Sequence, residues 1–126
     1  MLLALHNLRD FSVVESWSGY FHPTDPSGTK TLDIGTPEEN AQASAHTFVS
    51  TLRREFAAHP TFLAFYVGRN DERFRDENLE LARELTAARV PHLFRLYRGA
   101  HEPSVWNEHA RAWLALALDH LAVPHA

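Results

Sequence analysis

The sequence predicts an α/β fold in which about three parallel strands alternate with crossover helices. Three short segments rich in aromatic and branched apolar residues are separated by segments whose apolar residues recur at helical spacing. Parallel strands need connections of about a dozen residues or more, and the intervening segments are long enough to form helices. The 126 residues, 44% of them hydrophobic, suffice for one packed domain, which we place over residues 1–126.

The first predicted strand covers residues 11–17 (FSVVESW), whose aromatic and β-branched side chains favour extended backbone. The apolar residues 1–8 before it are predicted to be the end of a helix. Residues 19–36 contain several prolines, glycines and short polar side chains, so they are predicted to form a long irregular loop. Loops of this length often carry function.

A single amphipathic helix is predicted to follow, from Thr36 to the His59-Pro60 pair. Thr36 can cap the helix, Pro37 suits the first helical position, and Glu39 completes a capping box. The apolar face of this helix consists of Ala41, Ala45, Phe48, Val49, Leu52 and Phe56.

The second half of the chain repeats the order of strand, helix, strand and helix. Residues 62–67 (FLAFYV) are apolar throughout, which predicts a parallel strand covered on both faces. Apolar residues at helical spacing predict a helix over residues 74–88, and residues 92–97 (HLFRLY) are predicted to be the third strand. A last helix is predicted over residues 105–121, stopped by Pro124.

Charge and hydropathy exclude several classes of partner. The formal charge is −4, with 16 acidic and 12 basic side chains spread along the chain, so no basic stripe is available for nucleic acid. Residues 1–8 are too short for a membrane span or a signal peptide, and we therefore expect no membrane partner. The sequence leaves the compartment open, with the cytoplasm as the default expectation.

Residue types also limit the possible cofactors. The chain contains no cysteine, which excludes disulfides, thiolate metal sites and thiol catalysis. Its nine histidines include no HExxH pattern, and we expect no dedicated metal site. No glycine-rich phosphate loop follows a predicted strand, so we expect no nucleotide and no other cofactor.

Two polar turns follow the second and third predicted strands. Gly-Arg-Asn-Asp ends at Asp71, and Gly-Ala-His ends at His101. Ligands gather at the carboxyl ends of parallel strands, and neighbouring strands lie about 4.8 Å apart. If the two strands are neighbours, the Asp71 carboxylate can orient the His101 imidazole as a general base.

Structural roles remain open for the same residues. Asp71 could cap the helix that begins near Phe74, and His101 could be a surface or capping residue before the last helix. Trp17 and Trp106 could pack in the core.

Several segments resemble the C-terminal half of the esterase family of α/β hydrolases that includes esterase-D-like enzymes, feruloyl and acetyl esterases, and mycolyltransferases. The resemblance covers almost the whole chain, and its most specific parts are the GRND and GAH turns. It is carried by residues 15–26 (ESWSGYFHPTDP), 62–71 (FLAFYVGRND), 73–78 (RFRDEN) and 91–101 (PHLFRLYRGAH), and by Trp106.

This resemblance implies the C-terminal part of an α/β-hydrolase fold and a small-molecule ester as substrate. The family's triad runs serine, acid, histidine, so Asp71 maps to the acid and His101 to the base, with Glu72 a weaker candidate for the acid. The substrate-binding candidates that accompany the pair are Trp17, Tyr20 and Trp106.

The nucleophile of the family has no counterpart in the sequence. The Gly-x-Ser-x-Gly elbow would precede the helix to which residues 1–8 belong, and Ser18 does not meet the pattern because Ser16 and Tyr20 occupy its glycine positions. We therefore expect a truncated chain with two of three triad members, inactive by itself as an esterase.

An alternative is a noncatalytic α/β fragment or protein-interaction module that keeps the scaffold without the chemistry. In either case, residues 11–17 would be an internal strand of a complete sheet. An exposed edge of this strand predicts self-association.

Overall fold

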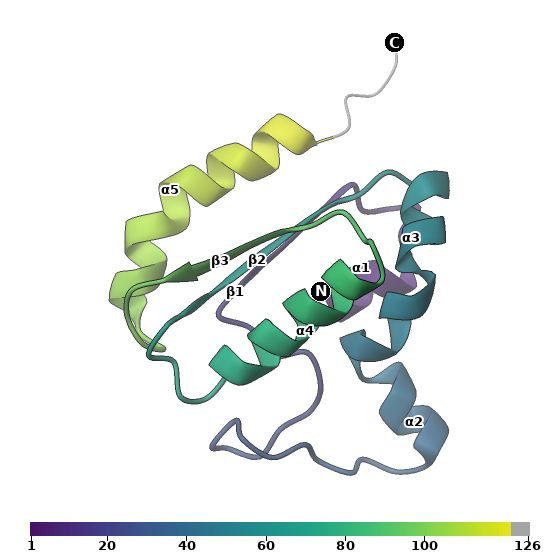
Figure 1. The fold of residues 1–126 in the computed structure, drawn as a ribbon, viewed down its shortest axis with the longest axis horizontal. Helices are drawn as coiled ribbons and strands as arrows, with labels where there is room; N and C mark the ends of the chain where they lie inside the picture. The colour runs from purple at the N-terminus through teal and green to yellow at the C-terminus, as the bar shows by residue number, and fades with distance from the viewer. Residues whose placement is uncertain (122–126) are drawn as a thin grey trace.

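The computed structural model describes residues 1–121 and contains strands and helices in alternation (Figure 1). Pro124, the predicted stop of the last helix, lies outside these residues. The elements are α1 (Leu2–His6), β1 (Val13–Trp17), α2 (Pro37–Gln42), the 3₁₀ helix η1 (Ala45–Phe48), α3 (Val49–Ala58), β2 (Phe62–Gly68), α4 (Arg75–Ala87), β3 (Leu93–Tyr97) and α5 (Pro103–His120).

One parallel sheet with the order β1-β2-β3 forms the centre of the molecule, as the sequence predicts. Strand β2 is the middle strand, and the four residues from Ala64 to Val67 are fully buried. Its nearly unbroken apolar sequence follows from this position, because helices cover both faces of the sheet. In the register, Val13 lies opposite Phe62, Trp17 opposite Tyr66, Ala64 opposite Leu93, and Gly68 opposite Tyr97.

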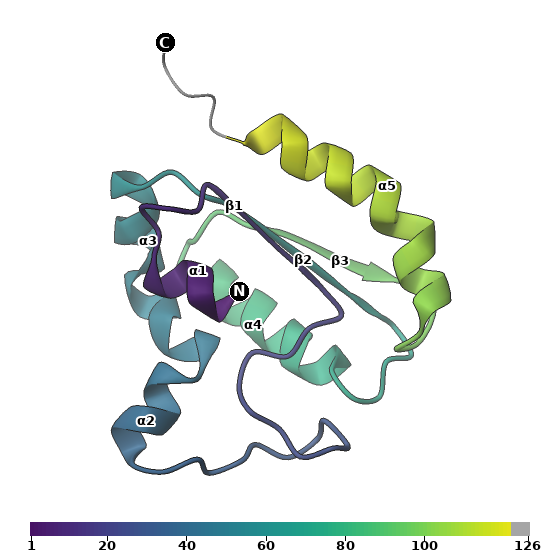
Figure 2. The same cartoon turned by 180° about the vertical axis from the view of Figure 1, so that it is seen from behind.

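Alternate side chains of β2 enter two different cores. Leu63 and Phe65 join the larger core, with residues of α1, α3 and α4, whereas Ala64 and Tyr66 join a smaller core under α5. Figures 1 and 2 show the corresponding layers, with α5 on one face of the sheet and the other helices on the opposite face. The period of two along a strand produces this division.

The prediction of one continuous helix over residues 36–59 is wrong. The capping box at Thr36 forms as predicted, but α2 ends at Gln42 and the chain continues through η1 before α3 begins. Ser44 adopts extended backbone at the break, and the Ala45 N–H donates to the Phe21 carbonyl at 2.7 Å. This long-range hydrogen bond replaces the helical one, because Ala45 packs in the core beside the preceding loop.

The loop predicted over residues 19–36 is irregular, as expected, but it is anchored at its start. Phe21 is buried and its ring packs edge-on against Phe65 with centroids 5.8 Å apart. The Asn78 side chain of α4 donates to the Gly19 carbonyl at 2.9 Å. The loop therefore begins in a fixed position above the larger core.

Within residues 1–121, no helix combines the length and the apolar character that crossing a lipid bilayer requires.

Candidate active site

The turns after β2 and β3 lie against each other at the carboxyl edge of the sheet. The Arg69 N–H donates to the Tyr97 carbonyl at 2.7 Å, and the Asn70 N–H donates to the Gly99 carbonyl at 2.8 Å. A side chain at Gly68 would collide with the backbone of Gly99. Glycine therefore permits the close approach that brings the two turns together.

These turns place Asp71 and His101 in direct contact. The Asp71 side chain is fully buried, and its Oδ2 accepts a hydrogen bond from His101 Nδ1 at 2.9 Å. Its Oδ1 accepts from the backbone N–H groups of Arg73 at 3.0 Å and Phe74 at 2.9 Å. One oxygen of Asp71 thus closes the turn before α4, whose own N-cap is Phe74 and has no side-chain cap, and the other oxygen pairs with His101 as the sequence predicts. Three donors satisfy a carboxylate that would otherwise be costly to bury.

The contact with Asp71 determines which nitrogen of the His101 ring carries the proton when the ring is neutral. A carboxylate accepts, so Nδ1 carries a proton and the neutral ring presents the lone pair of Nε2. Nε2 has no hydrogen-bond partner among residues 1–121, and the side chain is 25% exposed. The rings of Phe74 and Trp106 meet it edge-on, each at a centroid distance of 5.1 Å. His101 is thus a fixed imidazole with one nitrogen available for proton transfer.

Ser18 links the end of β1 to the same site. It is buried at 3% exposure, has a φ of 54°, and its Oγ accepts from Trp106 Nε1 at 3.0 Å. This hydrogen bond fixes the Trp106 ring beside His101. Sequence reasoning considered Ser18 only as a nucleophile and did not find this contact, since 88 residues separate the two partners.

The other predicted site residues lie in different surroundings. Tyr20 is 60% exposed and its ring lies 5.6 Å from that of Phe74, which also contacts His101. Trp17 stacks on Tyr66 at 6.2 Å in the smaller core and donates to Glu15, an arrangement that favours the packing interpretation. Glu72 is exposed, and Asp71 is the carboxylate that pairs with His101.

A hollow of about 450 Å³ opens beside Tyr20, between the start of α1 and the end of β1. Met1, Ser16 and Gly19 contribute to its walls, but His101 does not. Trp106 and Phe74 are therefore the aromatic side chains that border the histidine itself.

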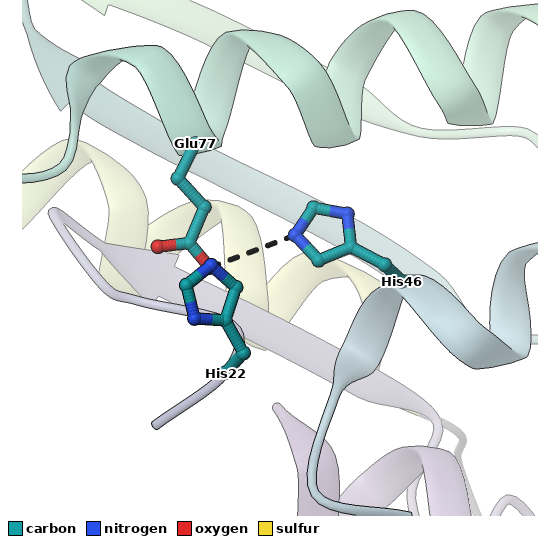
Figure 3. A group of neighbouring side chains, drawn as sticks. All are labelled: His22, His46 and Glu77. Atoms are coloured by element: carbon teal, nitrogen blue, oxygen red, sulfur yellow. Dashed lines mark ion pairs between the residues drawn. The ribbon is translucent and has the colours of Figure 1, made fainter. Parts of the chain in front are cut away.

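The structure also gathers three side chains that the sequence did not connect. His22 from the long loop, His46 from η1 and Glu77 from α4 have potential ligand atoms that all lie within 4.8 Å of one another (Figure 3). Separations of 24 and 31 residues follow no metal-binding motif, so no local signal predicted this cluster.

His46 has an altered proton affinity in this cluster. Burial alone would lower the pKa of His46, but its hydrogen bonds to Glu77 and Glu84 and the charges of these carboxylates outweigh burial and raise it from 6.5 to about 9.

No protein-family model and no curated protein matches the chain. The solved structures that resemble it in three dimensions include an esterase and a hydrolase. A ferulic acid esterase matches with a TM-score of 0.66 and 17% identity over 94% of this chain and 46% of the other. The apoenzyme of an S-formylglutathione hydrolase from Staphylococcus aureus matches with a TM-score of 0.68 and 17% identity, over 93% and 45%.

The chain therefore spans less than half the length of either solved structure. At 17% sequence identity, the structural likeness establishes the shared fold alone, to which the three parallel strands and their crossover helices belong. The chain has the fold of the C-terminal part of an α/β hydrolase.

Proposed function

We propose that this chain supplies the acid and the base of a serine carboxylic-ester hydrolase. The observation that carries the proposal is the 2.9 Å contact between the buried Asp71 carboxylate and His101 Nδ1 at the carboxyl edge of the sheet. The two solved structures described above are named as a ferulic acid esterase and an S-formylglutathione hydrolase, which supports the reaction class.

In the proposed reaction, His101 Nε2 removes the proton of a serine hydroxyl as its oxygen attacks the ester carbonyl carbon. Asp71 keeps the proton on Nδ1 and stabilises the imidazolium that forms. His101 then gives the proton from Nε2 to the leaving alcohol, which departs and leaves an acyl-serine. Water attacks the acyl group by the same sequence of proton transfers, which releases the carboxylic acid and restores the serine.

We propose that the nucleophilic serine lies outside residues 1–126. No serine of the sequence has the Gly-x-Ser-x-Gly surroundings of a nucleophile elbow. Ser18, at the end of β1, is buried and its oxygen accepts the Trp106 indole N–H. The greater length of both solved structures supports this arrangement, because each has room for a further half of the fold.

Trp106 and Tyr20 are proposed to contact the ester. The Trp106 ring contacts the His101 ring directly. The Tyr20 ring contacts Phe74, whose ring in turn contacts His101. Aromatic walls of this kind suit an apolar acyl or alcohol group.

A fluorophosphonate probe, which labels activated serines, tests the proposal on the 126-residue chain. Peptide mapping of parent, His101→Ala and Ser18→Ala chains should give no adduct, because the acid and base lack their nucleophile. A single adduct at Ser18 that disappears in His101→Ala would instead show that the chain contains a complete site. An adduct of unchanged yield in His101→Ala would remove His101 from the mechanism.

The acid–base pair has an independent test in proton NMR. A hydrogen bond from Nδ1 to a buried carboxylate shifts its proton far downfield and slows its exchange with water. This resonance should be present in the parent and absent from Asp71→Asn and His101→Ala. A spectrum without it in the folded parent would contradict the proposed base, and the noncatalytic alternative would then hold.

A further inference from the structure

We propose that His22, His46 and Glu77 form a binding site for one Zn²⁺ ion. The three side chains come from separate segments: the loop after β1, the 3₁₀ helix η1 and the first turn of α4 (Figure 3). Two imidazoles and one carboxylate are a common set of protein ligands for zinc. The proposal concerns a second site and does not depend on the proposed esterase function.

The distances between the ligand atoms fit a single ion. His22 Nε2 lies 3.2 Å from Glu77 Oε1, and His46 Nε2 lies 3.6 Å from the same oxygen. Zinc binds nitrogen and oxygen at about 2.0–2.2 Å in a tetrahedron, which places its ligand atoms about 3.3 Å apart. These two separations lie close to this value, and all three ligand atoms lie within 4.8 Å of one another, so an ion can bind after side-chain movements.

The Nδ1 nitrogen of each imidazole, which does not face Glu77, already has a hydrogen-bond partner. His46 Nδ1 contacts Glu84 Oε2 at 2.7 Å, and His22 Nδ1 contacts the Pro23 carbonyl at 3.2 Å. Both partners are acceptors, so each Nδ1 donates, and an ion that displaces any proton on Nε2 would meet a lone pair directed toward Glu77. Outer-shell carboxylates and carbonyls fix zinc-binding histidines in this manner.

Glu77 supplies an independent indication that a cation belongs in the cluster. Its side chain is only 8% exposed, and Oε2 is buried without a hydrogen-bond partner among residues 1–121. Oε1 accepts from the Phe21 N–H at 2.6 Å and faces the two imidazole nitrogens. Where the imidazole nitrogens carry no proton, they and Oε1 repel unless a positive charge lies between them, and a buried oxygen without a partner, such as Oε2, is costly.

The site has a route to solvent and room for a further ligand. A hollow of about 250 Å³ reaches His22 and Glu77 from the surface, and Glu80 also contributes to its wall. The side chain of His22 remains 20% exposed. A water molecule entering by this route would complete the tetrahedron.

Zinc would fasten the long loop to α4, the helix that follows the Asp71 turn. Phe21 and His22 follow Tyr20 directly, and Glu77 lies six residues after Asp71 on the chain. An ion held between His22 and Glu77 would therefore hold the loop beside α4 in one position. We expect a structural role, with the loop more rigid when zinc is bound.

Isothermal titration of EDTA-stripped protein with ZnCl₂ tests the site. The parent should bind one ion with a well-defined affinity, and its melting temperature should rise with zinc concentration. Loss of an outer-shell partner typically weakens metal binding by about 10- to 100-fold, which is the effect expected for Glu84→Gln. His22→Gln and Glu77→Gln, which remove ligands, should weaken it at least as much.

His59→Gln is the matched control, because this partly exposed histidine lies outside the cluster. It should bind zinc like the parent. Circular dichroism without metal checks the fold, and the partly exposed His22 keeps the test valid if Glu77→Gln unfolds. Equal zinc affinity in His22→Gln and parent would overturn the proposal. So would a parent that binds no zinc, in which case protons on the imidazoles supply the positive charge.

Discussion

Asp71 combines a structural and a proposed chemical role in one carboxylate. Asp71→Ala would leave the Arg73 and Phe74 N–H groups without their partner, so we expect it to lower the free energy of unfolding by about 1–3 kcal/mol. Asp71→Asn keeps one oxygen for these amides and should be less destabilising. Its amide nitrogen, however, cannot accept from His101 Nδ1. Urea denaturation measures both variants, and an Asp71→Ala chain as stable as the parent would contradict this account.

The raised pKa of His46 predicts that the stability of the metal-free protein depends on pH. The folded-state pKa of about 9 exceeds the reference value of 6.5, so the contribution of the group to stability is complete below pH 6.5 and is lost as the pH rises through 9. Its side chain is 18% exposed, and the contribution is at most about 3 kcal/mol. Urea denaturation in EDTA from pH 6 to 10 should show a decline that His46→Gln reduces. An equal decline in the parent and in His46→Gln would show that other titrating groups cause the loss of stability.

The elements that hold the site depend on one glycine between β3 and α5. Gly99 has a φ of 118°, and a side chain there would collide with Val105. We expect Gly99→Ala to destabilise the protein by about 1–3 kcal/mol, because both the backbone and the contact must adjust. Ser104→Ala, at an exposed position in the first turn of α5, is the control. Chemical denaturation compares the two, and equal stability would show that the turn relaxes without cost.

The same elements show what sequence patterns can reveal. The apolar run of β2 and the turns after β2 and β3 are local signals, and together they predicted that Asp71 and His101 meet. The break before η1 has no local signal, because it depends on the Ala45 contact with Phe21, 24 residues away. The gathering of His22 with Glu77 likewise depends on how the loop folds back over α4.

At the scale of the whole molecule, the open edge of the sheet predicts self-association. Among residues 1–121, β1 pairs only with β2, and the Ser12 carbonyl and Ser18 N–H face that partner. By the period of two, residue 15 directs its N–H to the outer edge, where a second chain could pair with it. We expect concentration-dependent association in sedimentation velocity, which Glu15→Pro weakens by removing this donor.

Glu15→Gln is the matched control for the edge, because it also removes the carboxylate beside the Trp17 indole but keeps the backbone donor. It should associate like the parent, and circular dichroism should show that both variants keep the fold. A sharp monomer at all concentrations of the parent would refute the prediction. Equal association of the proline variant and the parent would place the contact elsewhere, with the exposed Leu114 and Leu118 of α5 as the next surface to test.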